Sequence, residues 1–217
     1  NAGTSTGAPW KHCPGDARAT GPAGSATLAA GDVVIFRGGV SYDTASGAGI
    51  RLLWSGSSGN PIIYDGNSAG TWGTGKAVIQ GPNTANDRGF YDVGTARNWI
   101  AIRHFVIRDM GGYAESDPIW STTDPISSPP TGFGVQLEGG SANLVIQDCD
   151  FIEIGQWQNQ QPMSGTTSVT GTAISLENNS FVTITNVTAT RGKTAVSIKA
   201  SASGGGRNTI DNILVTH

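Results

Sequence analysis

The chain has 217 residues, of which 32 are glycine and only 13% are charged, and its formal net charge is −3. This charge, without any stripe of lysine and arginine, excludes the footprint of a nucleic-acid-binding protein, so no nucleic-acid partner is expected. No apolar run approaches the roughly 20 residues of a membrane-spanning helix, so no membrane span is expected either. The abundance of glycine, threonine, serine, asparagine and valine is typical of an all-β protein rich in turns.

The N-terminal region, up to about residue 30, is rich in small residues and is expected to form a cap with a short helical piece near 16–19. Short strands are predicted within 31–39, 59–64 and 76–81, each between glycine-containing turns, and then at 90–93 and 99–107. We expect one domain over residues 1–217. Because the chain starts at Asn1 without methionine and stops at His217 within a repeat, we expect a processed chain or part of a longer one.

One pattern recurs three times in the second half, over 134–151, 173–189 and 195–215. Each copy has a short alternating strand, a polar turn, a second strand, a bend at Asp or Asn, and a third strand. A repeat of this size cannot bury its apolar face alone, so copies must stack on one another. The repeat predicts a stack with about three short strands per coil.

Aligning the repeats predicts which residues stack. The two inward columns are Ile102, Ile146, Ile184 and Ile210, and Phe105, Cys149, Val187 and Ile213. The column at the bend is His104, Asp148, Asn186 and Asn212. Such side chains cap their own turn and bond their neighbours, so His104 belongs either to this turn ladder or to a catalytic or metal site. Cys149 is expected to be a buried free thiol rather than the disulfide partner of Cys13.

Three segments of the first half resemble a known family: Leu28–Gly39, Ser55–Ile62 and Val78–Gly81 are similar to the N-terminal portion of many secreted β-helix polysaccharide lyases. The resemblance is to the pectate-lyase-like superfamily. It implies an all-β, right-handed, single-stranded parallel β-helix that is secreted or displayed at the cell surface, with polysaccharide bound along the outer face of one sheet. The superfamily includes lyases, hydrolases, epimerases, tailspikes and adhesins, so the activity stays open.

A candidate site follows from the first strand of each repeat, where Glu138, Glu177 and Lys199 occupy equivalent positions. Stacking would set neighbours about 4.8 Å apart, where two carboxylates repel by roughly 3 kcal/mol at an effective dielectric near 20, and by less in solvent. Protonation of one Glu, a cation such as Ca²⁺ bound between Glu138 and Glu177, or pairing of Lys199 with Glu177 would relieve this repulsion. The column is therefore either a site or a solvated structural ladder.

Two long connections, over 111–133 and 155–171, would flank this column. They carry Tyr113, Trp120 and Trp157, whose rings either stack on sugars or pack on the outer wall. A basic cluster lies nearby in the sequence. It consists of Arg191, Lys193, Lys199 and Arg207.

The leading functional hypothesis is a polysaccharide lyase, or a relative that only binds, acting on an acidic polysaccharide. Lys193 or Lys199 would be the base, Arg191 would bind substrate, and Ca²⁺, the only cofactor considered, would neutralise the substrate carboxylate. A glycoside hydrolase is the runner-up, with Glu138 and Glu177 as its carboxylate pair. The alternative is a structural or adhesive β-helix, such as a tailspike, a fibre or a cell-surface repeat module. Its last strand would offer an open C-terminal edge for self-association or a further chain.

Overall fold

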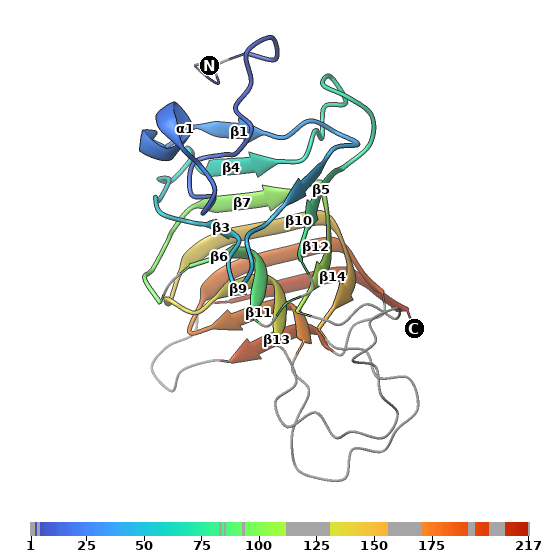
Figure 1. Ribbon diagram of the computed structural model, residues 1–217. Helices are drawn as coiled ribbons and strands as arrows, with labels where there is room; N and C mark the ends of the chain where they lie inside the picture. The colour runs from blue at the N-terminus through green and yellow to red at the C-terminus, as the bar shows by residue number, and fades with distance from the viewer. Residues whose placement is uncertain are drawn as a thin grey trace, which may run out of the picture.

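The computed structural model describes residues 3, 5–82, 84, 86–92, 94–111, 131–155, 171–190, 194–199 and 207–216. Within these residues the chain is almost entirely β, and its strands stack in chain order from the N-terminal to the C-terminal end (Figure 1). This confirms the all-β prediction. None of the helices in the described part is long and apolar enough to span a membrane.

The helix lies later than predicted. Residues 16–19 form turns, in which the Arg18 amide donates to the Asp16 carboxylate and Asp16 bridges to Ile50. The helix, α1, runs over Gly21–Ser25 and has a proline in its first turn. Proline fixes the backbone angle that begins a helix, so the helix begins at Gly21–Pro22 rather than at Asp16.

The strands form two sheets, and every strand pair within them is parallel. The nine-stranded sheet contains β1 (Val33–Ile35), β2 (Ser41–Asp43), β4 (Ile62–Asp65), β5 (Ala77–Gln80), β7 (Ile100–Arg103), β8 (Phe105–Met110), β10 (Ala142–Ile154), β12 (Ser180–Thr190) and β14 (Thr209–Thr216). The five-stranded sheet contains β3 (Ile50–Arg51), β6 (Asp87–Tyr91), β9 (Gly132–Leu137), β11 (Gly171–Glu177) and β13 (Thr194–Lys199).

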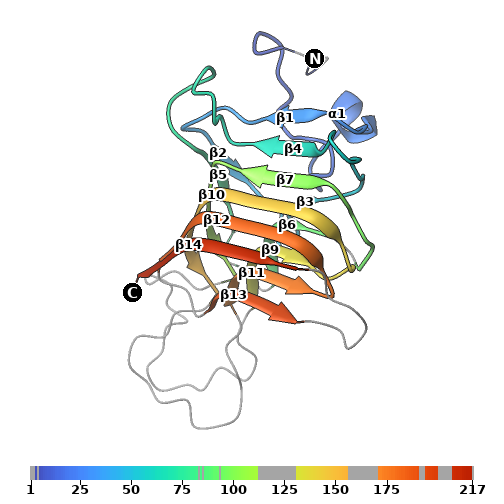
Figure 2. The ribbon, with the colours of Figure 1, turned by 180° about the vertical axis from the view of Figure 1, so that it is seen from behind.

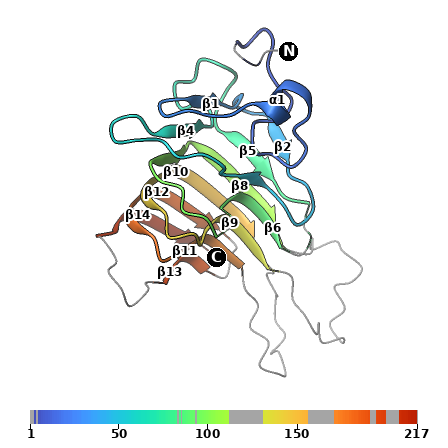
Figure 3. The ribbon, with the colours of Figure 1, turned by 90° about the vertical axis from the view of Figure 1, so that its left-hand side faces the viewer.

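The nine-stranded sheet is bent. The first half of β10 pairs with β7 and its second half pairs with β8, so one long strand spans two shorter ones. Figure 2 shows β4, β7, β10, β12 and β14 stacked in that order, and Figure 3 shows β9, β11 and β13 beside this stack. The core therefore lies between the five-stranded sheet and the bent sheet.

The registers agree with both predicted columns, and their members are buried up to β12, whereas on β14 Ile210 is 47% exposed and Ile213 is only partly buried. Ile146 pairs with Ile102 on one side and with Ile184 on the other, and all three are buried. Cys149 pairs with Val187, and it is a buried free thiol as predicted. Burial raises the pKa of this thiol to about 12. Edge-to-face aromatic contacts fill the N-terminal half of the core, where the Phe105 ring centre lies 5.1 Å from that of Phe36.

The predicted turn ladder is confirmed in its backbone conformation and in two of its side-chain bonds. The backbone is left-handed at His104, Asp148, Asn186 and Asn212, with φ between 52° and 62°. The Asn212 side-chain amide donates to the Asn186 oxygen at 2.6 Å, and Nδ1 of His104 lies 2.5 Å from Oδ2 of Asp148. Asn and Asp tolerate this conformation, and their side chains link neighbouring bends.

Candidate functional site

The outer face of the five-stranded sheet carries a row of polar and aromatic side chains in register across all five strands. The row consists of Arg51, Tyr91, Gln136, Ser175 and Ser197. Successive residues of a strand point to opposite faces, and the residues just before this row are core residues such as Phe90 and Val135. The row therefore forms the outer wall of the sheet.

Arg88 joins this row because the strands depart from strict alternation. Gly89 and Gly134 precede the core residues of their strands, and neither position has room for a side chain. A Cβ at Gly134 would lie 2.3 Å from the Phe151 ring, and one at Gly89 would lie 2.4 Å from the Gly134 carbonyl oxygen. Two consecutive positions thus face inward, which leaves Arg88 on the outer face with Tyr91.

The Arg88 guanidinium is held in place by several contacts. Its Nε donates to the side-chain oxygen of Gln136, and Nη1 donates to the carbonyl oxygens of Gly47 and Asn86 at 3.2 Å. Its central carbon lies 5.4 Å from the centre of the Tyr91 ring. The Nη2 group has no hydrogen-bond partner within the described part of the chain, so it can bind an anion.

Glu138 extends this network. Nε2 of Gln136 donates to Oε1 of Glu138 at 2.6 Å, and the Glu138 backbone amide donates to the buried carboxylate of Asp92 at 2.8 Å. Asp92 also accepts the Gly139 amide at 3.1 Å, which positions the turn after β9. Glu138 therefore presents an oriented, solvent-exposed carboxylate just after β9, two residues beyond Gln136 of the outer row.

The stacking predicted for Glu138, Glu177 and Lys199 agrees with the registers. Leu137 pairs with Leu176, so the two glutamates follow paired residues, and Glu177 pairs with Lys199. Among the residues that the structure describes, no ion pair joins Glu177 to Lys199. No group of three or more His, Cys, Asp or Glu residues that could hold a metal ion occurs there either. Calcium binding between Glu138 and Glu177 stays a prediction.

Several predicted site residues lie outside the described residues, so their roles also stay predictions. They are Tyr113, Trp120, Trp157, Arg191 and Lys193. Four residues of the outer face were not among the predicted site residues. They are Arg51, Arg88, Tyr91 and Gln136. A usable signal was present, because Arg88-Gly89-Phe90-Tyr91 and Phe133-Gly134-Val135-Gln136 share one pattern of outward and inward positions.

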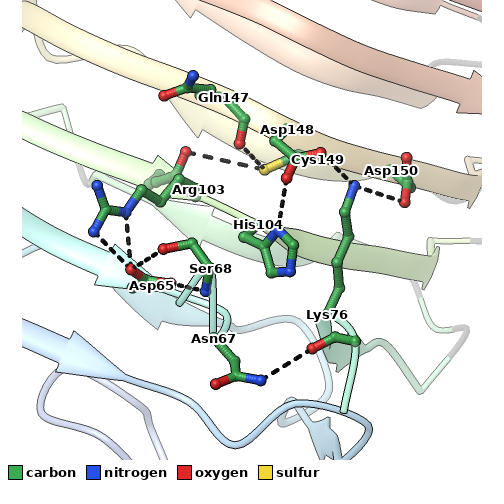
Figure 4. Close-up of polar contacts among 12 residues, drawn as sticks. Asp65, Asn67, Ser68, Lys76, Arg103, His104, Gln147, Asp148, Cys149 and Asp150 are labelled. Carbon is green, nitrogen blue, oxygen red and sulfur yellow. Dashed lines mark hydrogen bonds and ion pairs between the residues drawn. The ribbon is translucent and has the colours of Figure 1, made fainter. Parts of the chain in front are cut away.

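A second charged cluster lies at the bends of the nine-stranded sheet (Figure 4). Lys76 Nζ lies 2.8 Å from Asp148 Oδ1 and 3.0 Å from Asp150 Oδ2, and Asp148 also contacts His104. Burial lowers the pKa of Lys76, but its bonds to the two carboxylates outweigh burial and raise that pKa. Lys76 therefore stays protonated and cannot act as a general base near neutral pH. The cluster links the loop before β5 to β10.

No family model and no curated protein match the chain. Among solved structures, it is similar to a mannuronic acid specific polysaccharide family 6 lyase enzyme from human gut microbiota, with 17% sequence identity and a TM-score of 0.40. The similarity covers 89% of this chain and 55% of the lyase chain, so this chain spans about half the length of that enzyme. At this level of similarity, function has to be inferred from the site itself.

Proposed function

We propose that the protein is a carbohydrate-active β-helix that binds acidic polysaccharide along the outer face of its five-stranded sheet. The arrangement of Arg88, Tyr91 and Gln136 carries this proposal. A guanidinium group matches a sugar carboxylate, and a half-exposed aromatic ring offers a flat surface to a sugar ring. The Gln136 amide joins Arg88 to Glu138, and Arg88 lies over the Tyr91 ring, so the face presents a cation, a ring and a carboxylate together.

The proposed architecture is a right-handed, single-stranded parallel β-helix with about three strands per coil. Chain order supports it, because β6 is followed by β7 and β8, and β9 is followed by the two halves of the bent β10. Connections between parallel strands of one sheet are right-handed with few exceptions. The proposed location is secreted or at the cell surface.

The proposed reaction is β-elimination at a uronic acid residue. Lys199, on the same face as Glu177, or Lys193 would remove the proton beside the substrate carboxylate. The electron pair would form a carbon–carbon double bond in the ring, and the glycosidic bond to the leaving oxygen would break, with that oxygen taking up a proton. The predicted Arg191 would bind the substrate.

Glu138 and Glu177 are the residues that would hold Ca²⁺, because carboxylate oxygens are its preferred ligands. Two carboxylates provide only part of its coordination, so substrate and water would supply the rest. When bound, Ca²⁺ would neutralise the substrate carboxylate. The Gln136 amide bonds one oxygen of Glu138, and the other has no hydrogen-bond partner among the described residues, which leaves it for this role.

The experiment is to mix the protein with polygalacturonate, alginate or chondroitin sulfate, with and without Ca²⁺, and to follow ultraviolet absorbance and polymer binding. A rise in absorbance that Lys199→Ala or Lys193→Ala removes supports elimination. New reducing ends without absorbance would instead indicate the hydrolase, with Glu138 and Glu177 as its carboxylates. Binding without cleavage would leave a binding protein, and neither binding nor cleavage would overturn the proposal.

A structural or adhesive role is the second candidate, and the surface of β14 favours it. Three apolar side chains of this strand are about half exposed. They are Ile210, Leu214 and Val215, with exposed fractions of 47%, 56% and 49%. β14 pairs with β12 and with no other described strand. A further strand or a second copy of the chain would bury these side chains. Self-association that depends on Leu214 in sedimentation experiments would support this candidate.

A further inference from the structure

A column of side chains crosses the beginnings of five stacked strands of the nine-stranded sheet. We call it the corner ridge, and it consists of Pro61, Trp99, Asn143, Phe181 and Arg207. Figure 2 shows β4, β7, β10, β12 and β14 stacked in this order. The registers of these strands, extended to the neighbouring positions, set the five residues side by side in the same order. In the chain, the ridge positions at Asn143 and Phe181 come just after the turns that follow Glu138 and Glu177.

The backbone at the centre of the corner ridge is left-handed, with φ of 58° at Trp99, 58° at Asn143 and 53° at Phe181. Asparagine adopts this conformation readily, whereas a bulky side chain in it is an outlier. Asn143 is therefore the residue that the backbone favours at this corner. Trp99 and Phe181 occupy the equivalent positions on their strands, although their bulky side chains disfavour this backbone conformation.

Burial does not explain Phe181, whose side chain is 56% exposed. Trp99 is more buried than Phe181 and keeps only part of its surface exposed. Neither ring stacks on another aromatic ring or on a cation of the described chain. Conformational strain that brings little packing in return is a feature of functional positions.

The spacing of the rings suits a glycan. Adjacent parallel strands lie about 4.8 Å apart, so Trp99 and Phe181, two strands apart, are separated by about 10 Å. This is close to the length of a disaccharide in an extended chain, so each ring can stack on every second sugar. Asn143 lies between the rings and can bond hydroxyl groups, and the exposed Arg207 follows Phe181 and can bind a carboxylate.

We propose that the corner ridge is a second carbohydrate-binding surface, which holds an extended acidic glycan along the direction in which the strands stack. The acidic class of ligand rests on the proposed function. The polar residues between and beside the rings favour a glycan, because Asn143 and Arg207 can bond its hydroxyl and carboxylate groups. The ridge would hold a long polymer while the outer face of the five-stranded sheet acts on another part of it.

The test compares Phe181→Asn and Trp99→Asn with Phe181→Tyr, which keeps a ring, and with Tyr91→Ala on the sheet face. Affinity electrophoresis in gels containing polygalacturonate or alginate measures polymer binding, and thermal unfolding measures stability. We expect either Asn variant to weaken binding roughly five- to tenfold without lowering the unfolding temperature, because Asn relieves the left-handed strain. Phe181→Tyr should bind like the wild type.

Other outcomes separate the ridge from the proposed function. If both Asn variants bind like the wild type while Tyr91→Ala loses binding, the ridge proposal is overturned and the proposed function stands. If the Asn variants lose stability together with binding, the rings are structural and the ridge proposal is overturned. The ridge proposal would also be overturned if the wild-type protein bound no glycan but self-associated, and if the Asn variants lost that self-association. The ridge would then be a protein interface. Binding that needs Phe181 but not Tyr91 would support the ridge alone.

Discussion

The guanidinium carbon of Arg88 lies 5.4 Å from the centre of the Tyr91 ring on the same strand, β6. The Arg88–Gln136 hydrogen bond fixes the guanidinium plane over that ring. Lysine has the same charge but neither the planar fork nor five donors. We therefore expect Arg88→Lys to weaken binding of polygalacturonate or alginate about tenfold, as measured by isothermal titration calorimetry, with little change in unfolding temperature.

Arg37→Lys is the matched control, because the Arg37 side chain is exposed and makes no ion pair or hydrogen bond within the described residues. This control should bind like the wild type. Equal affinity of Arg88→Lys and the wild type would show that the Arg88 guanidinium does not contact the glycan.

Lys76 joins the loop before β5 to two carboxylates on β10. Lys76→Met keeps the length of the side chain and removes its charge, which leaves Asp148 and Asp150 without their shared cation. We expect a loss of about 1 kcal/mol in the free energy of unfolding, since these groups are only partly buried. Urea denaturation measures it. Lys11→Met is the control, at an exposed lysine without an ion pair among the described residues, and it should change this free energy little. A Lys76→Met variant as stable as the wild type would contradict the role of the cluster.

Asp65 predicts how stability depends on pH. Burial raises its pKa, but hydrogen bonds from Ser68 and Arg103 outweigh burial and lower the pKa below its ordinary value. A lowered folded-state pKa stabilises the fold above the unfolded value, about 3.9, and this stabilisation is lost as pH falls through the folded-state pKa. Asp65→Asn should lower the free energy of unfolding by about 2 kcal/mol at pH 7 and should flatten its fall below pH 4. Parallel pH profiles for both proteins would contradict this account.

Phe105 occupies the centre of the aromatic core, with its ring centre 5.1 Å from that of Phe36 and 5.2 Å from that of Phe90. Phe105→Ala would leave a cavity among rings that cannot collapse into it. We expect a loss of about 3–5 kcal/mol in chemical denaturation. Ile35→Ala, at a side chain that is 53% exposed, should cost far less, and similar losses for both variants would contradict the assigned core.

The stacking could be predicted from the sequence because each repeat satisfies its own bend. The column of His104, Asp148, Asn186 and Asn212 combines a backbone preference of each residue type with the repeat spacing, which sets these residues beside one another in the stack. The inward isoleucines then follow from the alternation of a strand. The same logic placed Glu177 beside Lys199 correctly.

The rest of the site depends on contacts that local patterns do not encode. Gly89 and Gly134 each face inward together with the residue that follows them. Strict alternation along the strand would therefore predict that Arg88 points inward, whereas it lies on the outer face. Lys76 reaches Asp148 and Asp150 from a loop that has no counterpart in the aligned repeats. The Lys76–Asp150 and Arg88–Gln136 contacts join segments that the aligned repeats do not place together.

The most direct test of the central claim is hydroxyl-radical footprinting of the protein with and without polygalacturonate or alginate. We expect the polymer to protect Tyr91 from oxidation, while Tyr42, at the N-terminal end of the nine-stranded sheet, reacts at the same rate in both samples. Unchanged oxidation of Tyr91 at polymer concentrations that saturate binding would contradict the claim that the outer face of the five-stranded sheet binds acidic polysaccharide.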